Sequence, residues 1–283
     1  MNAGPPSSTH DSHEPPPRVS VVVPCYDSEP YIEQTVASLL EQGMRDCEIV
    51  LVDDGSRDGT VGLIRSLMDR PSSRSIRLIE QANAGQAGAR NTGIEAARGR
   101  YILPLDSDDL LAEGMLAYCA DRLDVDPGLE LVYGDREDFG DVSGVHASGR
   151  FELDRLKYFN QLPYCAMYRR SLWQRVGGYQ RNVSGFDDWG FWIAAAAAGA
   201  RAEHVPRVLM RHRRRRSSQM WSMLDRYEKV YSQIVLNNAA CYSQAEVEAA
   251  DRHLRENRPS RMASLSRLVF LGLYYQGYEK SDE

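Results

Sequence analysis

The chain has 283 residues, of which 42% are hydrophobic and 26% are charged, a composition typical of a globular protein with a sizeable core. Its net charge is −6, from 34 basic and 40 acidic side chains, which argues against a general nucleic-acid-binding protein. The longest apolar run, residues 268–275, is too short to span a bilayer.

The first residues and the cysteines predict where the protein works. Residues 1–17 contain many Pro, Ser and His side chains and no apolar stretch, so we expect a disordered tail and not a secretory signal. The five cysteines are scattered and lack the spacing of a metal site. We therefore expect reduced thiols and a cytoplasmic protein.

The chain then alternates between two patterns. Buried-strand patterns occupy residues 19–24, 47–54, 76–80, 101–106 and 130–135. Helical patterns lie between them at residues 30–42, 59–68, 84–98 and 110–123. This alternation predicts an α/β fold with a mostly parallel sheet sandwiched by helices.

The rhythm changes after residue 151. Residues 163–179 read as a strand and a helix ending in a glycine turn, residues 186–200 as a helix, and residues 204–216 as a strand with a basic end. Residues 217–283 contain two or three polar helices without a chemical motif. We expect one domain over residues 18–216 and a helical extension over residues 217–283.

Polar residues follow each predicted strand. In parallel sheets, ligands bind beyond the carboxyl ends of the strands, so these residues are expected to meet in one cleft. Neither the dinucleotide fingerprint GxGxxG nor the phosphate loop GxxxxGK[ST] follows the first strand. Dehydrogenase and P-loop NTPase functions are therefore disfavoured.

The most informative cluster is LDSDD at residues 105–109. Carboxylates are hard oxygen ligands that suit Mg²⁺ or Mn²⁺, and alternate acids can contact a ribose and a metal that bridges a diphosphate. The alternative is that Asp108 or Asp109 caps the helix expected at residues 110–123.

Two further acidic pairs allow similar alternatives. Asp53 and Asp54 repel each other unless a partner compensates, and the N–H of a nucleobase is one candidate partner, although a simple turn explains the residues that follow. Asp187 and Asp188 start a predicted helix, where they are either capping residues or contain a general base. An ordinary Asp has a pKa of about 3.9, so such a base would be ionised at neutral pH.

The run RHRRRR at residues 211–216 is either a solvated surface or a binding site for phosphate. At the rim of a cleft, these arginines could hold a leaving diphosphate through bidentate hydrogen bonds.

Taken together, the segments VSVVVPCYDSEPYIEQTVASLLEQ, EIVLVDDGSRDGT and NAGQAGARNTGIEAARGRYILPLDSDD resemble the family 2 glycosyltransferases. The resemblance runs in order from about residue 18 to residue 216. It implies the GT-A fold, a Rossmann-like sheet, and inverting transfer of a sugar from a nucleotide diphosphate to a hydroxyl group.

The resemblance also assigns donor-binding residues. It implies that Pro24 and Tyr26 frame the nucleoside pocket and that Asp54 binds the base, with Asp53 as its neighbour. Residues that would border the nucleotide are Asn83, Gly85 and Arg90. In the same way, Asp106 and Asp108 match the DxD pair.

For the reaction itself, the resemblance implies that Asp188 is the general base and that Asp187 orients the acceptor. It implies that Asp108 contacts the ribose or the metal and that Asp109 contacts the metal or the donor sugar, with Mn²⁺ or Mg²⁺ as the metal. The family often carries Tyr-Arg-x-His after its last core strand. In this chain either His212 or Arg215 takes the place of that His, depending on the alignment, so His212 is a further candidate metal ligand.

The expected substrates are a nucleotide sugar, most simply UDP-linked, and a glycan, glycolipid or small-molecule acceptor. The apolar run at residues 268–275 would pack on the core, contact the inner face of a membrane, or form a homodimer. Two alternatives remain open, nucleotidyl transfer and a binding module for nucleotide sugars on a similar fold.

Overall fold

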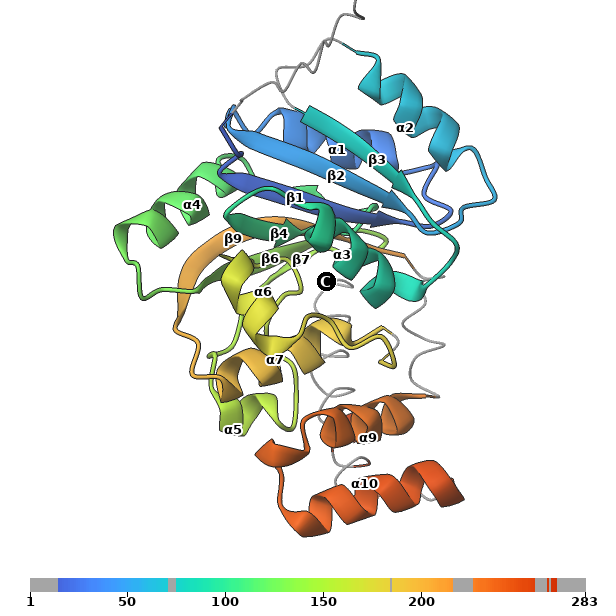
Figure 1. Cartoon of the computed structure of the whole chain (residues 1–283), viewed down its shortest axis with the longest axis vertical. Helices are drawn as coiled ribbons and strands as arrows, with labels where there is room; N and C mark the ends of the chain where they lie inside the picture. The colour runs from blue at the N-terminus through green and yellow to red at the C-terminus, as the bar shows by residue number, and fades with distance from the viewer. Residues whose placement is uncertain are drawn as a thin grey trace, which may run out of the picture.

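The computed structural model describes residues 15–70, 75–183, 185–215, 226–257, 264 and 266–268 (Figure 1). Most of the expected tail, residues 1–14, and most of the apolar run at residues 268–275 lie outside these ranges. In the described parts of the chain, no helix is long and apolar enough to cross a membrane.

The elements follow one another as an α/β protein. The strands are β1 (Val19–Cys25), β2 (Cys47–Asp53), β3 (Ser75–Glu80), β4 (Tyr101–Pro104), β5 (Leu110–Leu111), β6 (Leu131–Gly140), β7 (Gly144–His146), β8 (Met167–Arg169) and β9 (Ala202–Arg214). The α-helices are α1 (Ile32–Leu40), α2 (Thr60–Met68), α3 (Gly85–Ala96), α4 (Met115–Val125), α5 (Leu153–Leu156), α6 (Arg170–Val176), α7 (Asp187–Ala197), α9 (Tyr227–Asn237) and α10 (Gln244–Glu256).

The sheet is mostly parallel, as the sequence predicts. Its strand order is β3-β2-β1-β4-β8-β6-β9-β5, with β7 paired to β6. Strands β1 to β4 run parallel, β6 and β9 pair in parallel, and β8 runs antiparallel between β4 and β6. The carboxyl ends of β1, β2 and β4 therefore lie at one edge, where the site is expected.

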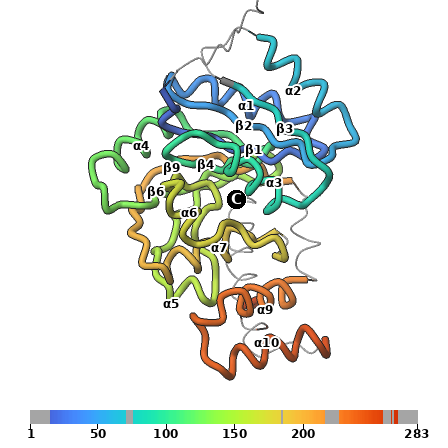
Figure 2. The backbone as a smooth tube through the Cα atoms, viewed as in Figure 1, coloured from blue at the N-terminus to red at the C-terminus, as the bar shows by residue number. Residues whose placement is uncertain are grey.

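Alternating side chains bury both faces of the sheet. In β2, Val50 and Val52 belong to the core cluster shared with α3 and α7, whereas Ile49 and Leu51 belong to the cluster shared with α1 and α4. Because neighbouring side chains on a strand point to opposite faces, a continuous apolar strand serves two cores. Figure 2 shows α3 on the opposite side of the sheet from α1 and α2.

One predicted element is wrong. Residues 110–123 do not form a single helix, because Leu110 and Leu111 form β5 and pair with Arg211 and Met210 of β9. The helix α4 begins only at Met115, after Gly114 at φ 70°. Asp108 and Asp109 therefore do not cap it, and the pairing instead carries them to β9.

The C-terminal helices α9 and α10 pack below the sheet (Figure 1). The Tyr227 ring at the start of α9 lies 5.5 Å from the Phe186 ring and 6.2 Å from the Trp189 ring, measured between centroids. Through this ring, the helix α9 contacts the first turn of α7.

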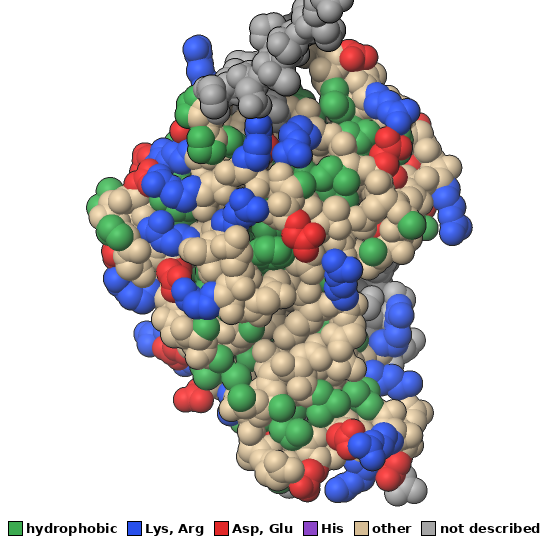
Figure 3. All heavy atoms as spheres, viewed as in Figure 1, with side chains coloured by type: hydrophobic (Ala, Val, Ile, Leu, Met, Phe, Trp, Pro, Cys, Tyr) green, Lys and Arg blue, Asp and Glu red, His purple; other side chains and the backbone are tan. Residues whose placement is uncertain are grey.

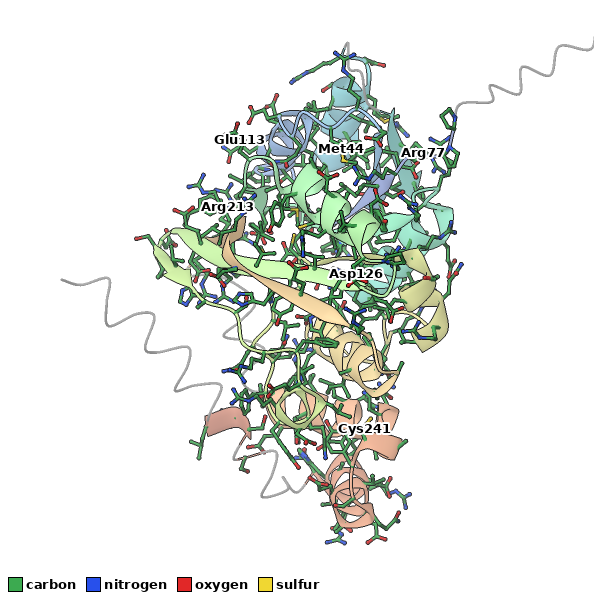
Figure 4. The ribbon with its side chains drawn as sticks, turned by 90° about the vertical axis from the view of Figure 1, so that its left-hand side faces the viewer. Met44, Arg77, Glu113, Asp126, Arg213 and Cys241 are labelled. Carbon is green, nitrogen blue, oxygen red and sulfur yellow. The ribbon has the colours of Figure 1, made fainter. Side chains whose placement is uncertain are left out.

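Ser243 and Glu246 form a reciprocal capping box that starts α10. Cys241, near these helices, and the other four cysteines are free thiols, as expected (Figure 4).

Candidate active site

A single cavity of about 1090 Å³ brings the predicted strand ends together. It is lined by segments that follow β1, β2 and β4, by the first turns of α3 and α7, and by the end of β9. Of the predicted site residues, it is lined by Pro24, Tyr26, Asp54, Asn83, Gly85, Arg90, Asp106, Asp108, Asp187, Asp188 and His212. Asp53 and Asp109 are buried and do not line it. The basic and acidic groups elsewhere on the surface are mixed, as the face in Figure 3 shows.

The end of the cavity near β1 and β2 is lined by Pro24, Tyr26, Asp54 and Asn83. Tyr26 is 42% exposed, which leaves its ring available to a ligand. The Asn83 side-chain amide donates to the Asp54 backbone oxygen at 2.9 Å, which holds the segment before α3 against the end of β2. Gly85 starts α3 at φ 76°, a backbone conformation that favours glycine.

Protein groups donate hydrogen bonds to both carboxylates after β2. Asp53 Oδ2 accepts hydrogen bonds from the backbone N–H groups of Gly55 and Ser56, each at 3.2 Å. Asp54 Oδ1 accepts from the Gln81 side chain at 2.7 Å and from the Ala84 backbone at 2.8 Å. Asp53 Oδ1 is buried without a hydrogen-bond partner among the described residues, so protein donors compensate Asp53 only in part. Asp54 still lines the cavity, whereas Asp53 shapes the turn.

Arg90 connects two acidic segments at the centre of the cavity. Its Nη1 donates to Asp187 at 2.6 Å and its Nη2 to Asp106 at 2.6 Å, and its side chain is only 3% exposed. The guanidinium carbon lies 5.2 Å and 5.6 Å from the ring centroids of Tyr164 and Tyr179. Burial alone would lower the pKa of Arg90, but the two carboxylates raise it well above its usual value. Arg90 thus binds carboxylates of the protein.

Asp108 faces the basic end of β9. Its Oδ2 accepts a hydrogen bond from Arg215 at 2.7 Å, and Arg215 also contacts the Tyr31 hydroxyl at 3.3 Å. Burial raises the pKa of Asp108, while the charge of Arg215 opposes that increase. Arg213 lies at the end of β9 and donates to the Asp108 backbone oxygen at 2.8 Å (Figure 4). The basic run is therefore part of the cavity wall.

His212 also lines the cavity, and a buried carboxylate stands behind it. Its Nδ1 lies 3.3 Å from Asp138, which is paired with it across β6 and β9. Asp138 also binds Arg136 at 2.9 Å and His146 at 3.1 Å, and hydrogen bonds from the two histidines lower its pKa against the effect of burial. A carboxylate behind one ring nitrogen is the arrangement that orients metal-binding histidines.

These residues partly fit a divalent cation. Asp108 supplies a hard oxygen and His212 a nitrogen at the same cavity. No group of three or more His, Cys, Asp or Glu side chains within the described residues could hold a metal ion alone. Mg²⁺-type sites commonly use one or two protein ligands together with substrate phosphates, so the pair suits a cation that binds with a diphosphate.

Asp109 occupies a structural position. Its Oδ2 accepts from the Tyr164 hydroxyl at 2.5 Å and its Oδ1 from the Arg213 backbone at 2.7 Å. The side chain is 1% exposed, and burial raises its pKa to about 7. These contacts fasten the segment after β4 to β9, so we do not place Asp109 in the cation site.

Asp188 lies at the start of α7 on the same cavity as Asp108. Its Oδ2 accepts from the Asn160 side chain at 2.8 Å, and the N-cap residue of the helix, Phe186, makes no side-chain hydrogen bond. Burial and the neighbouring charge of Asp187 raise its pKa to about 7, while Arg90 opposes the increase. This pKa differs from the ordinary value that the sequence suggests, and a base that titrates near neutrality is well matched to proton transfer.

Several cavity residues carry no signal in the sequence. Asn160 and Tyr164 lie in an irregular segment between β7 and β8, and Arg136 lies on β6. Arg181 and Arg226 lie in the segments just before α7 and α9. Such residues could be found only from tertiary contacts, because no strand end or motif marks them.

Curated proteins similar to this chain include glycosyltransferases and polysaccharide synthases. The chain is 27% identical over 196 residues to chondroitin synthase of Escherichia coli, covering 68% of this chain and 28% of that protein. It is 46% identical over 99 residues to the uncharacterized glycosyltransferase EpsJ of Bacillus subtilis, covering 35% of this chain and 28% of that protein. The chain thus spans under a third of the length of both relatives.

Solved structures share the fold. TarS of S. aureus in complex with UDP-GlcNAc superposes with a TM-score of 0.64 at 21% identity, covering 84% of this chain and 73% of that chain. The mannosyltransferase PcManGT of Pyrobaculum calidifontis, in complex with GDP-Man and Mn²⁺, superposes with a TM-score of 0.61 at 23% identity, covering 94% and 84%. Both likenesses confirm the GT-A-like architecture.

The family model described as glycosyl transferase family 2 matches residues 20–177, more than half of the chain. The matched residues include β2 to β4 and the segments after β1, β2 and β4 that line the cavity, Asp108 among them. The chain belongs to glycosyl transferase family 2.

Proposed function

We propose that this protein transfers a sugar from a nucleotide diphosphate donor, most simply a UDP-sugar, to an acceptor hydroxyl with inversion at the anomeric carbon. The observation that carries the proposal is that Asp108 and Asp188, 80 positions apart in the sequence, line one cavity. The acceptor would be a hydroxyl of a glycan, a glycolipid or a small molecule. UDP-GlcNAc on TarS and GDP-Man on PcManGT support a nucleotide-sugar donor.

The nucleoside would bind at the end of the cavity formed by Pro24, Tyr26 and Asp54. Tyr26 offers an exposed ring for stacking, and the buried carboxylate of Asp54 can accept from a base N–H. The diphosphate would then extend toward Asp108 and the basic end of β9. There, Arg215 and Arg213 provide fixed guanidinium groups that suit phosphate oxygens.

Asp108 and His212 would hold a divalent cation, Mn²⁺ or Mg²⁺, together with the donor diphosphate. When bound, the cation would supply positive charge next to the leaving group. The Mn²⁺ ion in the PcManGT structure supports this assignment. The arginines at the end of β9 would stabilise the same developing charge, which is the main electrostatic requirement of the transfer.

Asp188 would accept the proton of the acceptor hydroxyl. As the proton moves to the carboxylate, the hydroxyl oxygen forms a bond to the anomeric carbon, and the bond from that carbon to the diphosphate breaks. Attack from the face opposite the leaving group inverts the anomeric centre in one displacement. Asn160 and the Asp187–Arg90 pair keep Asp188 oriented toward the cavity.

The substitution Asp188→Asn tests this proposal. The amide cannot accept the proton, so we expect transfer to fall about 10²–10⁴-fold while UDP binding is retained. Transfer is measured with a panel of nucleotide sugars, and UDP binding by calorimetry. Asp154→Asn, an exposed acid on α5, serves as the matched control. Near-normal transfer by the Asp188 variant would remove it from the role of base.

A further inference from the structure

Three guanidinium groups that line the cavity have no ion-pair partner among the described residues. Each carboxylate that lines it has a protein partner: Asp27, Asp54, Asp106, Asp108, Asp187 and Asp188. By contrast, the lining guanidinium groups of Arg57, Arg181 and Arg226 form no ion pair with any residue that the structure describes. These three guanidinium groups are therefore available to a ligand.

Two of these arginines stand beside the first turn of α7. Arg181 follows Gln180, whose side-chain oxygen lies so close to Gly190 of α7 that a Cβ there would be 2.5 Å away. Arg226 directly precedes Tyr227, whose ring packs against Phe186 just before α7. Both arginines are exposed and line the cavity that contains Asp188.

The donor does not account for this charge. In the proposed function the diphosphate lies near Asp108 and the end of β9, where Arg213 and Arg215 already face it. Arg57 lies in the turn after β2, held by a hydrogen bond from its backbone N–H to Asp27 at 2.7 Å, at the nucleoside end. Arg181 and Arg226 are left for the second substrate.

Negative charge in an acceptor would otherwise be repelled near Asp188 when that base is ionised. Two guanidinium groups offset this repulsion and match phosphate or carboxylate oxygens in bidentate geometry. We propose that the acceptor is an extended molecule bearing phosphate or carboxylate groups, which Arg181 and Arg226 bind while its hydroxyl faces Asp188. This inference rests on the proposed function.

The acceptor is extended because the two arginines enter the cavity from opposite ends of α9. Asn237, the last residue of α9, accepts and donates hydrogen bonds with Asn182 and donates to Gln180, next to Arg181. Arg226 stands before the first residue of α9. A helix of 11 residues is about 16 Å long, and this separation of the two backbones favours contacts with different groups of a long acceptor over contacts with a single phosphate. Each arginine therefore contacts a different part of the acceptor.

The test compares matched charged and neutral probes on the full chain saturated with UDP. The carboxylate arm uses trigalacturonate against its trimethyl ester, and the phosphate arm uses a glycerol-phosphate trimer against triglycerol. Binding is measured by calorimetry at low and at high salt. We expect the charged probe of at least one arm to bind about tenfold more tightly than its neutral match, and the preference to weaken in high salt.

The variants Arg181→Gln and Arg226→Gln locate the effect. Each should reduce affinity for the preferred charged probe about tenfold and leave affinity for UDP and the neutral probes unchanged. Arg155→Gln on α5, an exposed arginine that does not line the cavity, should bind every probe as the wild type does. Equal or undetectable binding of charged and neutral probes, or unchanged affinity in both variants, would overturn the inference. Failure of UDP itself to bind would instead overturn the proposed donor function.

Discussion

Arg90 holds the acidic residues of the cavity in one arrangement. Its guanidinium group joins Asp106 after β4 to Asp187 on α7, with both N···O distances at 2.6 Å. Removing one partner of such a buried pair leaves an uncompensated charge, which typically costs about 3–5 kcal/mol. The resemblance to the family implies that Arg90 borders the nucleotide. In the structure, both of its ion-pair partners are carboxylates of the protein. It therefore fixes the segment after β4 against the first turn of α7.

The pH dependence of transfer follows from Asp188. With a pKa of about 7, Asp188 is protonated below neutrality and cannot accept the acceptor proton, so kcat should rise as pH increases through about 7. The substitution Asp187→Asn removes the negative charge that helps to raise this pKa, and Arg90 continues to lower it. We expect the acidic limb of the kcat profile to move to lower pH.

This shift is measured from pH–rate profiles of the wild type and of Asp187→Asn, with Asp154→Asn as the control. A limb at the same pH in all three proteins would show that Asp188 does not control the profile.

At the scale of elements, the position of α3 depends on Gly93. A Cβ at Gly93 would lie 2.4 Å from Val22 Cγ1 and 3.0 Å from Val52 Cγ2, so the helix packs directly on β1 and β2. Arg90 lies one turn earlier on the same helix. The close approach therefore sets how deeply Arg90 enters the cavity.

The substitution Gly93→Ala should force α3 away from the sheet. We expect it to reduce the free energy of unfolding by about 1–3 kcal/mol and to lower transfer through displacement of Arg90. Gly62→Ala is the matched control, since this exposed glycine of α2 has no atom within 4 Å of an added Cβ. Because alanine favours the helix, the control should gain up to about 1 kcal/mol. Urea unfolding measures the free energy of unfolding of both variants. Equal changes in the two variants would contradict this account.

At the scale of the whole molecule, the proposed cation site combines two distant parts of the chain. Asp108 follows β4, whereas His212 belongs to β9, and the pairing of β5 with β9 brings the two segments together. With only these two candidate ligands and no cluster of three within the described residues, the site needs donor oxygens to complete it.

We therefore expect Mn²⁺ to bind at least about tenfold more tightly in the presence of UDP than in its absence. Calorimetric titration of Mn²⁺ with and without UDP measures this coupling, and His212→Ala should weaken it. By reciprocity, excess chelator should weaken binding of UDP. Equal Mn²⁺ affinity with and without UDP would show that the diphosphate does not complete the site.

The strand-end residues were predictable because local pattern and topology agree. Continuous apolar strands such as residues 19–24 must be buried on both faces, and parallel strands bring their carboxyl ends to one edge. Asp54, Asp106 and Asp108 could thus be placed together before any coordinates. The helix expected at residues 110–123 exists as α4, but its expected start was wrong, because pairing with β9 outweighs the helical periodicity of Leu110 and Leu111.

The sequence by itself determined the alternation of strands and helices, the parallel sheet and the acidic ends of its strands, since these follow from side-chain periodicity and chain direction. Only the tertiary structure decided the partners of each charge. Arg90 binds two carboxylates, and Asp53 and Asp109 accept hydrogen bonds from backbone N–H groups. Arg181 and Arg226 remain without an ion pair among the described residues. Such partners depend on distances of a few ångströms between segments far apart in the chain. Local propensity for helix or strand does not predict those distances.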